Sequence, residues 1–461
     1  MSDATARRGR FGSLYSHGFV RVAAAVPRVR IADPQFNAER TIELARRASA
    51  AHAALVVFPE LGLSGYSIED LFQQEALRDA VLTALERVAV ESAELEPVLV
   101  VGAPLSADGG LYNAAVVIHR GRILAAVPKS YIPEYREFYE KRHFRAARDL
   151  PRTELVLRGE RVPFSPDLLF SSRDLPELTL YVEICEDLWA PIPPSSYAAL
   201  AGATIVANLS GSPVTIGKAE YRRLLCASQS ARTIGGYVFA SAGVGESTTD
   251  LAWDGQALIY ENGERLAESE RFSDTEQLIF GDINLDRLIA DRSTTSSFAD
   301  SVHDHRPRLE RMRRIELELG FWSLGPSVVP LRRRLERFPY VPADPQGRNE
   351  RCQEVYSIQV QGLETRLRAT GIDKVVIGVS GGLDSTHALM VAARACDRLD
   401  LPRTNVLAYT MPGFATSSHT LTDARELMAA LGVATGEIDI RPSATQMLRD
   451  LQADIEAIRY D

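Results

Sequence analysis

The sequence has few cysteines, no long apolar run and no excess of positive charge, and each absence excludes a class of protein. The four cysteines, at positions 185, 226, 352 and 396, form no C-x-x-C pair, so we expect neither a disulfide framework nor a zinc site. The longest uncharged stretch, Ala190 to Gly217, contains four prolines and does not have the pattern of a membrane span. A net charge of -9 argues against a nucleic-acid-binding surface.

The N-terminal residues and the chain length narrow the protein class further. The first ten residues carry arginines with no apolar segment behind them, which is not the pattern of a secretory signal. We therefore expect a reduced, cytoplasmic protein. A chain of 461 residues is too long for one hydrophobic core and should contain two or three domains.

The first part of the chain, to about residue 285, alternates short apolar runs with helical patterns. Several apolar runs are continuous, as expected for strands covered on both faces, so this part is predicted to be a layered α/β domain. The predicted strands are residues 19–25, 54–58, 98–102, 114–119, 178–184, 203–208 and 236–242, and the predicted helices are residues 37–50, 68–93 and 219–234.

A second α/β pattern begins at Cys352, where a helix leads into further strands and helices. It predicts the opening of a doubly wound parallel sheet with about three strands. The predicted strands are residues 374–379, 405–410 and 436–440, with helices at 385–399 and 419–431. The expected organisation is a flexible N-terminus (1–15), a first α/β domain (16–290), a connector carrying one helix (291–350) and a partial second domain (351–461).

Three residues in the first domain could together cleave an amide. Glu60, Lys129 and Cys185 each follow a strand-like run. A cysteine thiolate attacks amide carbonyls, but it needs a base to take its proton and a positive charge or N–H donors to hold the oxyanion. Glu60 can be the base, and Lys129 with the backbone N–H of Glu186 can hold the oxyanion. Taken one at a time, each residue also has a plainer interpretation, as core packing for the cysteine or a solvated charge for the others.

The residues around these three resemble the nitrilase superfamily. The motifs are Phe58-Pro59-Glu60-Leu61, Pro128-Lys129-Ser130-Tyr131 and Ile184-Cys185-Glu186-Asp187, in that family's order and spacing. The resemblance covers roughly residues 15 to 285 and implies a four-layer αββα sandwich with a Glu-Lys-Cys triad.

The resemblance also implies further site residues. Relatives carry a second catalytic glutamate after the lysine, for which Glu140 fits best and Glu137 is the competitor. The glutaminase branch of the family implies that four polar residues contact glutamine, namely Tyr135, Glu186, Ser212 and Lys218. For Lys218, an ordinary surface lysine at the start of a helix is an equally good interpretation.

A phosphate-binding loop is predicted where the first strand of the second domain ends. Gly381 and Gly382 allow the backbone to approach an anion, and amides at the start of the next helix, with the hydroxyls of Ser380 and Ser385, can bind pyrophosphate oxygens. The alternative is a plain strand-to-helix turn. The predicted ATP-binding residues are Gly378, Val379, Ser380, Gly381, Gly382, Leu383, Asp384, Ser385 and Met411.

This loop resembles that of the ATP-pyrophosphatases, which adenylate a substrate and expel pyrophosphate. With Met411-Pro412-Gly413 after the second strand, it is most similar to NAD synthetases, which places Thr410 and Met411 near the adenosine. Mg²⁺ is implied by the ATP site, and Asp384 could either serve Mg²⁺ or cap the helix.

The two resemblances together match the family of glutamine-dependent NAD synthetases. They imply an enzyme that hydrolyses glutamine and uses the ammonia, with ATP, to amidate deamido-NAD. They also imply a homo-oligomer, because members of the family form octamers. The alternatives are a lone nitrilase-type amidase, another ATP-pyrophosphatase that thiolates tRNA or forms asparagine, and a remnant without synthetic activity.

The end of the sequence carries an expectation of its own. Family members continue well beyond the position of Asp461, and the missing part holds most of the deamido-NAD pocket. On that basis the 461 residues would hydrolyse glutamine without making NAD. The segment after Cys352 would be marginally stable, because its last strand would leave an unpaired edge.

Overall fold

The computed structural model describes residues 11–150, 153–157, 159–320, 328–335, 337–338, 340–342, 344–414 and 416–451. The chain divides into two compact units, unit 1 up to Arg334 and unit 2 from Leu335 onward. No helix among the described residues is both long enough and apolar enough to cross a membrane. All four cysteines carry free thiols.

Unit 1 is built on two large mixed sheets, with a separate hairpin of β6 (Glu154–Leu157) and β7 (Glu160–Pro163). The first sheet has six strands, in the order β14 (Gln277–Asn284), β1 (Phe19–Val26), β2 (Leu55–Val57), β3 (Val98–Ala107), β4 (Gly110–His119) and β5 (Arg122–Pro128). The second has seven, in the order β13 (Glu264–Glu268), β12 (Ala257–Glu261), β11 (Gly236–Ser241), β10 (Ile205–Ser210), β9 (Thr179–Ile184), β8 (Leu168–Ser172) and β15 (Arg313–Leu317).

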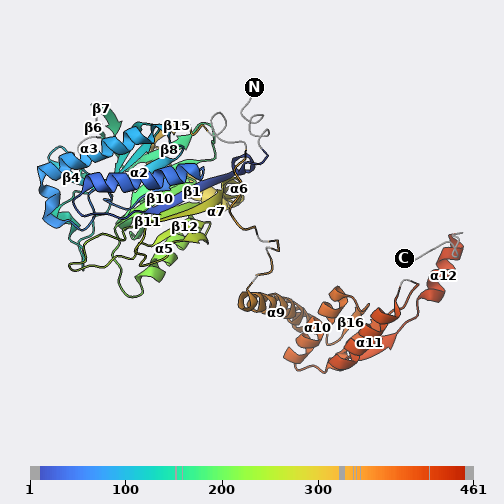
Figure 1. Ribbon diagram of the computed structural model, residues 1–461. Coiled ribbons are helices and arrows are strands. Elements are labelled where there is room, and N and C mark those ends of the chain that lie inside the picture. The colour runs from blue at the N-terminus through green and yellow to red at the C-terminus, as the bar shows by residue number, and fades with distance from the viewer. Residues whose placement is uncertain are drawn as a thin grey trace. The chain divides into compact units, whose positions relative to one another are not determined.

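The sheets pack face to face, and helices cover their outer faces, which gives the predicted αββα sandwich (Figure 1). Strand β1 shows why its sequence is continuously apolar. Val22 and Ala24 pack into the core between the sheets, whereas Ala23 and Ala25 pack toward the outer helices. The six-stranded sheet is covered by α2 (Pro34–Ala50) and α3 (Glu75–Glu91), and the other by α4 (Pro194–Leu200) and α5 (Lys218–Arg232).

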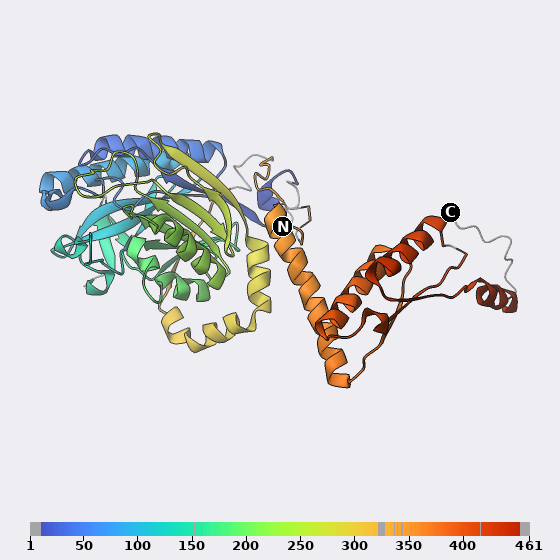
Figure 2. The same cartoon turned by 90° about the horizontal axis from the view of Figure 1, so that it is seen from below.

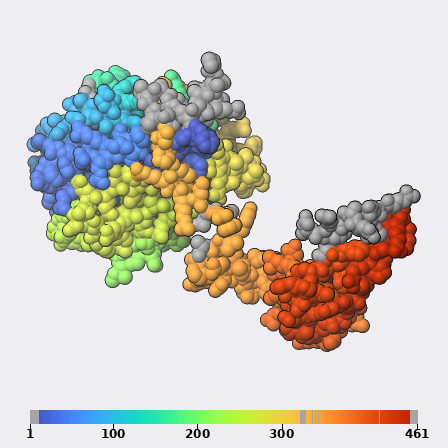
Figure 3. All heavy atoms as spheres, turned by 45° about the vertical axis from the view of Figure 1, so that its right-hand side comes forward, coloured from blue at the N-terminus to red at the C-terminus, as the bar shows by residue number. Residues whose placement is uncertain are grey.

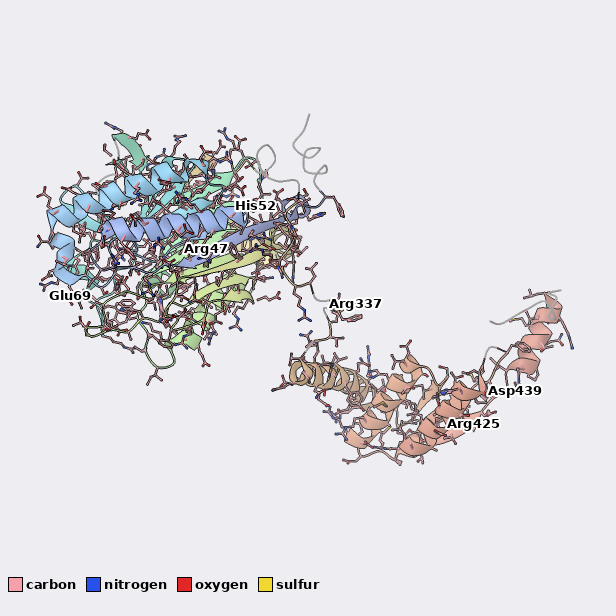
Figure 4. All side chains as sticks on the ribbon, viewed as in Figure 1. Arg47, His52, Glu69, Arg337, Arg425 and Asp439 are labelled. Atoms are coloured by element: carbon pink, nitrogen blue, oxygen red, sulfur yellow. The ribbon has the colours of Figure 1, made fainter. Side chains whose placement is uncertain are left out.

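Segments far apart in the sequence complete the first sheet. Strand β1 pairs antiparallel with β14, so the beginning and the end of the sandwich are neighbours, and blue and yellow residues adjoin on the surface of this unit (Figure 3). Of the predicted flexible N-terminus, residues 1–10 lie outside the described residues. Leu14 and Tyr15 are buried, and the Tyr15 hydroxyl donates to the carbonyl of His52, just past the end of α2 (2.6 Å; Figure 4).

The segment predicted as a connector with one helix is more structured than expected. It contains the last four residues of α6 (Leu285–Thr294), then α7 (Ser296–Asp304), α8 (Arg306–Leu309) and strand β15, which pairs parallel with β8 in the second sheet. Its high charge density suggested a solvated linker. Arg308, however, forms an ion pair with Asp167, the residue that precedes β8 (2.5 Å). The expectation of a single helix was therefore wrong. The curving path of α6 to α8 is visible in Figure 2.

Unit 2 is a βαβαβ arrangement whose three parallel strands lie in the order β16 (Val375–Gly378), β17 (Val406–Thr410) and β18 (Ala434–Glu437). The helices are α9 (Pro345–Thr370), α10 (Leu383–Arg398), α11 (Ser418–Leu431) and α12 (Arg441–Asp450). The third strand was predicted at residues 436–440, and β18 begins two residues earlier, at Ala434. Arg425 on α11 donates to Glu437 at the end of β18 (2.6 Å; Figure 4).

A buried ion pair between β1 and β14 provides a test of this fold. Arg21 donates to both carboxylate oxygens of Asp282 (2.7 and 3.0 Å), and both side chains are almost fully buried. We expect Asp282→Ala to lower the unfolding free energy by about 3–5 kcal/mol, because the guanidinium is left buried without its anion.

The measurement is urea denaturation followed by tryptophan fluorescence, since all three tryptophans precede residue 334. Glu91→Ala, which removes the exposed partner of Arg46, is the control and should cost less than about 1 kcal/mol. Equal effects of the two substitutions would contradict the structural importance of the buried pair.

Candidate active site

The ends of three strands bring the predicted amide-cleaving residues together. Glu60 follows β2, Lys129 follows β5, and Cys185 follows β9. The Lys129 ammonium donates to Glu60 Oε1 at 2.6 Å, and neither side chain has exposed surface. Cys185 is also buried, close enough to both for their charges to shift its pKa.

Lys129 is held by a second carboxylate, that of Glu140. Its ammonium donates to both Glu140 oxygens at 2.8 Å, and Glu140 begins a short 3₁₀ helix, η4 (Glu140–Arg142). Glu137, the competing candidate, instead accepts a hydrogen bond from Lys218 on the wall of the neighbouring cleft (3.4 Å). The geometry therefore favours Glu140 as the second glutamate beside the lysine.

Three groups that position the carboxylates were not predicted from the sequence. Asn113 Nδ2 donates to Glu60 Oε1, the backbone N–H of Gly211 donates to Glu60 Oε2 (both 2.6 Å), and the Tyr66 hydroxyl donates to Glu140 Oε1 (2.7 Å). A lone amide within the apolar strand β4 was a signal for Asn113. Gly211 offered no comparable signal, because its contribution comes from the backbone.

The backbone at the cysteine has an unusual conformation. Cys185 has a φ of 46°, in the left-handed region that side-chain-bearing residues rarely adopt, and it begins the 3₁₀ helix η6 (Cys185–Leu188). Asp187 accepts hydrogen bonds from the backbone N–H groups of Tyr131 (2.9 Å) and Ile184 (3.0 Å). One carboxylate therefore connects the loop after Lys129 to the segment that presents the thiol.

Burial dominates the protonation of the site. The pKa of Cys185 is raised to about 12, mainly by burial and also by the Glu60 carboxylate, with the Lys129 ammonium acting in the opposite direction. Burial also raises the pKa of Glu60 above its usual value, against the lowering effect of Lys129. A resting thiol beside a carboxylate of raised pKa has the arrangement needed for general-base activation.

The predicted glutamine-binding residues line one cleft with Cys185. This cleft has a volume of about 540 Å³, and Tyr135, Glu186, Ser212 and Lys218 all contribute to its wall. The Tyr135 hydroxyl donates to both Glu186 oxygens at 3.0 Å.

Lys218 is the first residue of α5, yet it is not an ordinary surface lysine. Only 11% of its side chain is exposed, its ammonium lies 5.0 Å from the centre of the Phe138 ring, and burial lowers its pKa. Ser212 is held by Arg222, another buried residue that sequence reasoning missed, whose Nε donates to Ser212 Oγ at 3.0 Å. The cleft thus offers a cation, a carboxylate and hydroxyls around the thiol.

The predicted phosphate loop of unit 2 forms a compact turn between β16 and α10. Gly381 has a φ of 85°, and a Cβ at this position would lie 2.1 Å from the Thr420 carbonyl oxygen, so only glycine fits. The hydroxyls of Ser380 and Ser385 are 3.1 Å apart, and the N–H of Gly382 donates to Ser380 Oγ (3.2 Å).

A second cleft, of about 380 Å³, opens at this turn. Among the predicted ATP-binding residues it is lined by Gly378, Val379, Ser380, Gly382 and Met411, and Thr410 also contributes. The remaining four, Gly381, Leu383, Asp384 and Ser385, belong to the turn and the first residues of α10 but do not line the cleft. Asp384 is the second helical residue, and Gly382 occupies the N-cap position.

Comparison with known proteins places this architecture in a family. The profile of the carbon-nitrogen hydrolases matches residues 21–293, and the chain therefore belongs to the carbon-nitrogen hydrolase family. The NAD synthase profile matches residues 355–460. The chain is 54% identical to the glutamine-dependent NAD(+) synthetase of Mycobacterium tuberculosis over 443 residues, which is 96% of this chain and 64% of that protein. It thus spans somewhat less than two thirds of the relative's length.

Solved structures show a similar fold. The glutamine-dependent NAD+ synthetase of Acinetobacter baumannii, solved with ADP, has a TM-score of 0.50 and 23% identity, and covers 96% of this chain and 69% of its own. The enzyme from Cytophaga hutchinsonii has a TM-score of 0.52 and 18% identity, and covers 95% and 68%.

The geometry predicts how the site responds to pH and substitution. Amide hydrolysis should require ionised Glu60 and should fall as the pH drops through its raised pKa, so the acidic limb of kcat/KM should lie above 4.5. We expect Glu60→Gln, Lys129→Ala and Lys129→Arg each to reduce turnover by about a hundredfold or more.

Steady-state glutamine hydrolysis across pH measures both effects. Lys141→Ala removes an exposed lysine beside Glu140 and serves as the control, with turnover expected to stay near that of the unmodified chain. An acidic limb at or below 4.5, or near-normal turnover after a change at Glu60 or Lys129, would contradict the assignment.

Proposed function

We propose that unit 1 hydrolyses glutamine through a thioester on Cys185 and that the released ammonia serves the ATP-dependent amidation of deamido-NAD to NAD+. The observation that carries this proposal is the cleft that Cys185 lines together with Lys218 and Glu186. An amino acid carries one carboxylate and one ammonium at its α-carbon, and among the charged residues of this wall Lys218 and Glu186 are complementary to these two groups. The carbon-nitrogen hydrolase and NAD synthase matches support the pairing of reactions.

The cleft suggests how glutamine would lie. Lys218 would pair with its α-carboxylate, and Glu186, oriented by the Tyr135 hydroxyl, would accept from its α-ammonium. Ser212 Oγ, fixed by Arg222, would hydrogen bond to the backbone groups of the substrate. These contacts would direct the side-chain amide toward Cys185.

The buried cluster would then carry out two acyl-transfer steps. Glu60 takes the Cys185 proton while Sγ attacks the amide carbon, and the Lys129 ammonium stabilises the oxygen that becomes negative. Glu60 returns this proton to the leaving nitrogen, which departs as ammonia and leaves a glutamyl thioester. Glu60 next takes a proton from water, which attacks the thioester and releases glutamate and the thiol.

Unit 2 would contribute ATP binding. The backbone at Gly381 and Gly382 would contact the phosphates, with Thr410 and Met411 near the adenosine. The first turn of α10 offers Asp384 as an exposed carboxylate, which suits Mg²⁺, since this ion usually takes one or two protein carboxylates and otherwise phosphates and water. Mg²⁺ would neutralise the phosphate charge when bound.

The amidation itself needs an activated carboxylate. The nicotinate carboxylate of deamido-NAD would attack the α-phosphorus of ATP and expel pyrophosphate, and ammonia would then displace AMP.

We also propose that the protein acts as a homo-oligomer in the cytoplasm, as its family resemblance implies. Assay of glutamine hydrolysis with and without deamido-NAD and ATP tests the coupling, because a lone amidase would not respond to either compound.

The nucleophile assignment can be tested with one substitution. Cys185→Ala should abolish glutamine hydrolysis, because among the described residues Cys185 alone of the four cysteines lines the cleft. Covalent labelling by a glutamine analogue, located by peptide mass spectrometry, should also be lost. Cys352→Ala, at an exposed position, is the control and should leave both unchanged. Labelling of Cys226, Cys352 or Cys396 would overturn the assignment.

The ATP loop can be tested separately. Gly381→Ala should weaken ATP binding at least about tenfold, because the new methyl group would collide with the Thr420 carbonyl and displace the turn. Gly362→Ala is the matched control, since this glycine lies in α9 with open space around it. Calorimetric titration with ATP measures the effect, and equal affinities for both variants would remove this turn from the ATP site.

A further inference from the structure

Glu246, in the loop that follows β11, is a buried carboxylate that the steps above do not use. Only 7% of its surface is exposed. The backbone N–H of Tyr66 donates to both carboxylate oxygens (2.9 Å to Oε1 and 3.1 Å to Oε2), and Oε2 also accepts from the N–H and the hydroxyl of Ser67 (3.0 and 2.6 Å). No cation in the described part of the chain forms an ion pair with it, and burying a carboxylate without one is unfavourable. Every hydrogen bond to its carboxylate comes from Tyr66 or Ser67.

Tyr66 in turn touches both sides of the catalytic cluster. Its hydroxyl donates to Glu140 Oε1 (2.7 Å), and Glu140 holds the Lys129 ammonium. Its ring packs closely against Gly211, where an added Cβ would be 2.3 Å from a ring carbon. The Gly211 N–H donates to Glu60 Oε2 (2.6 Å). A displacement of Tyr66 would therefore disturb both its own hydrogen bond to Glu140 and the position of the Gly211 N–H that donates to Glu60.

The loop that carries Glu246 is itself fixed to the sandwich. The Val29 N–H donates to the Val244 carbonyl (3.0 Å), and the Ser247 N–H donates to Ser67 Oγ (2.6 Å). The Trp253 indole donates to the Ser247 carbonyl (2.6 Å), and its ring packs edge-on against Tyr66, with centroids 5.4 Å apart. Glu246 thus acts from a rigid support.

We propose that Glu246 is a positioning residue for glutamine hydrolysis, acting through Tyr66 on the Glu60, Lys129 and Glu140 cluster. This inference rests on the proposed glutaminase function. Glu246 and Tyr66 are not among the residues that line the glutamine cleft. Loss of the Glu246 contact should therefore lower kcat and leave the KM for glutamine nearly unchanged.

The experiment is a double-mutant cycle with Glu246→Gln and Tyr66→Phe in the full 461-residue chain. A glutamine side chain keeps one acceptor oxygen, but its NH₂ group cannot accept, so the four hydrogen bonds that the two carboxylate oxygens accept from Tyr66 and Ser67 can no longer all form. We expect each substitution to lower kcat by about tenfold or more with KM within about twofold, and the double variant to lose no more than the more impaired single variant.

A matched control separates positioning from general destabilisation. Asp174 is likewise a buried carboxylate that accepts from two backbone N–H groups, those of Leu319 and Gly320, and from a serine hydroxyl, that of Ser172. Asp174→Asn should leave kcat unchanged. Multiplicative losses in the double variant, a rise in KM alone, or equal losses for Glu246→Gln and Asp174→Asn would each overturn the proposal.

Two further measurements cover the remaining outcomes. If Glu246→Gln does not fold, Ser67→Ala removes only the hydroxyl donor to the same carboxylate and should lower kcat less, and adding Ser67→Ala to Tyr66→Phe should cause no loss beyond that of Tyr66→Phe alone. If the unmodified chain hydrolyses no glutamine, the proposed function fails. Positioning is then judged by the rate at which iodoacetamide alkylates Cys185, because the Glu60, Lys129 and Glu140 charges, after burial, contribute to the pKa of that thiol. An unchanged rate in Glu246→Gln would overturn the inference.

Discussion

The Lys129 ammonium has no exposed surface, and the way its charge is neutralised determines the rest of the site. Glu60 and Glu140 both lie within 2.8 Å of it, so the buried cluster carries two negative charges and one positive charge while Cys185 stays a neutral thiol. Moving the cysteine proton to Glu60 leaves this net charge unchanged. The low-dielectric interior therefore does not oppose the transfer as strongly as it would oppose forming an isolated thiolate.

A cluster of this kind must be held rigidly, and the sandwich supplies the support from both sheets. Glu60 and Lys129 follow strands β2 and β5 of the first sheet, and Cys185 follows β9 of the second. Backbone and side-chain donors from neighbouring strands then satisfy the remaining carboxylate oxygens. Each of these groups is buried because the two sheets face each other, so packing and catalysis depend on the same interface.

Much of this arrangement could be predicted, because strand-end motifs carry both local structure and chemistry. Glu60, Lys129 and Cys185 follow apolar runs that did form strands. The contribution of Asn113 depends on the pairing of β4 with its neighbours, which one sequence does not specify. The segment after residue 290 was misjudged because its charges suggested an unstructured linker. Most of these charges are exposed, but β15 is an edge strand that pairs with β8, and Arg308 pairs with Asp167, which is distant in sequence. Local sequence patterns predict helices and strands, but the ion pairs that charged residues form depend on partners that are distant in the sequence.

The pairing of β1 with β14 has a consequence for synthesis on the ribosome. Strand β1 occupies an interior position in the first sheet, yet one of its two neighbours is made about 250 residues later. The edge of β1 therefore stays unpaired until the chain has been translated past Asn284, and β15 completes the edge of the second sheet later still. At roughly 5–20 residues per second, this interval lasts on the order of ten to fifty seconds. During it, the nascent chain exposes an apolar strand edge of the kind that chaperones protect.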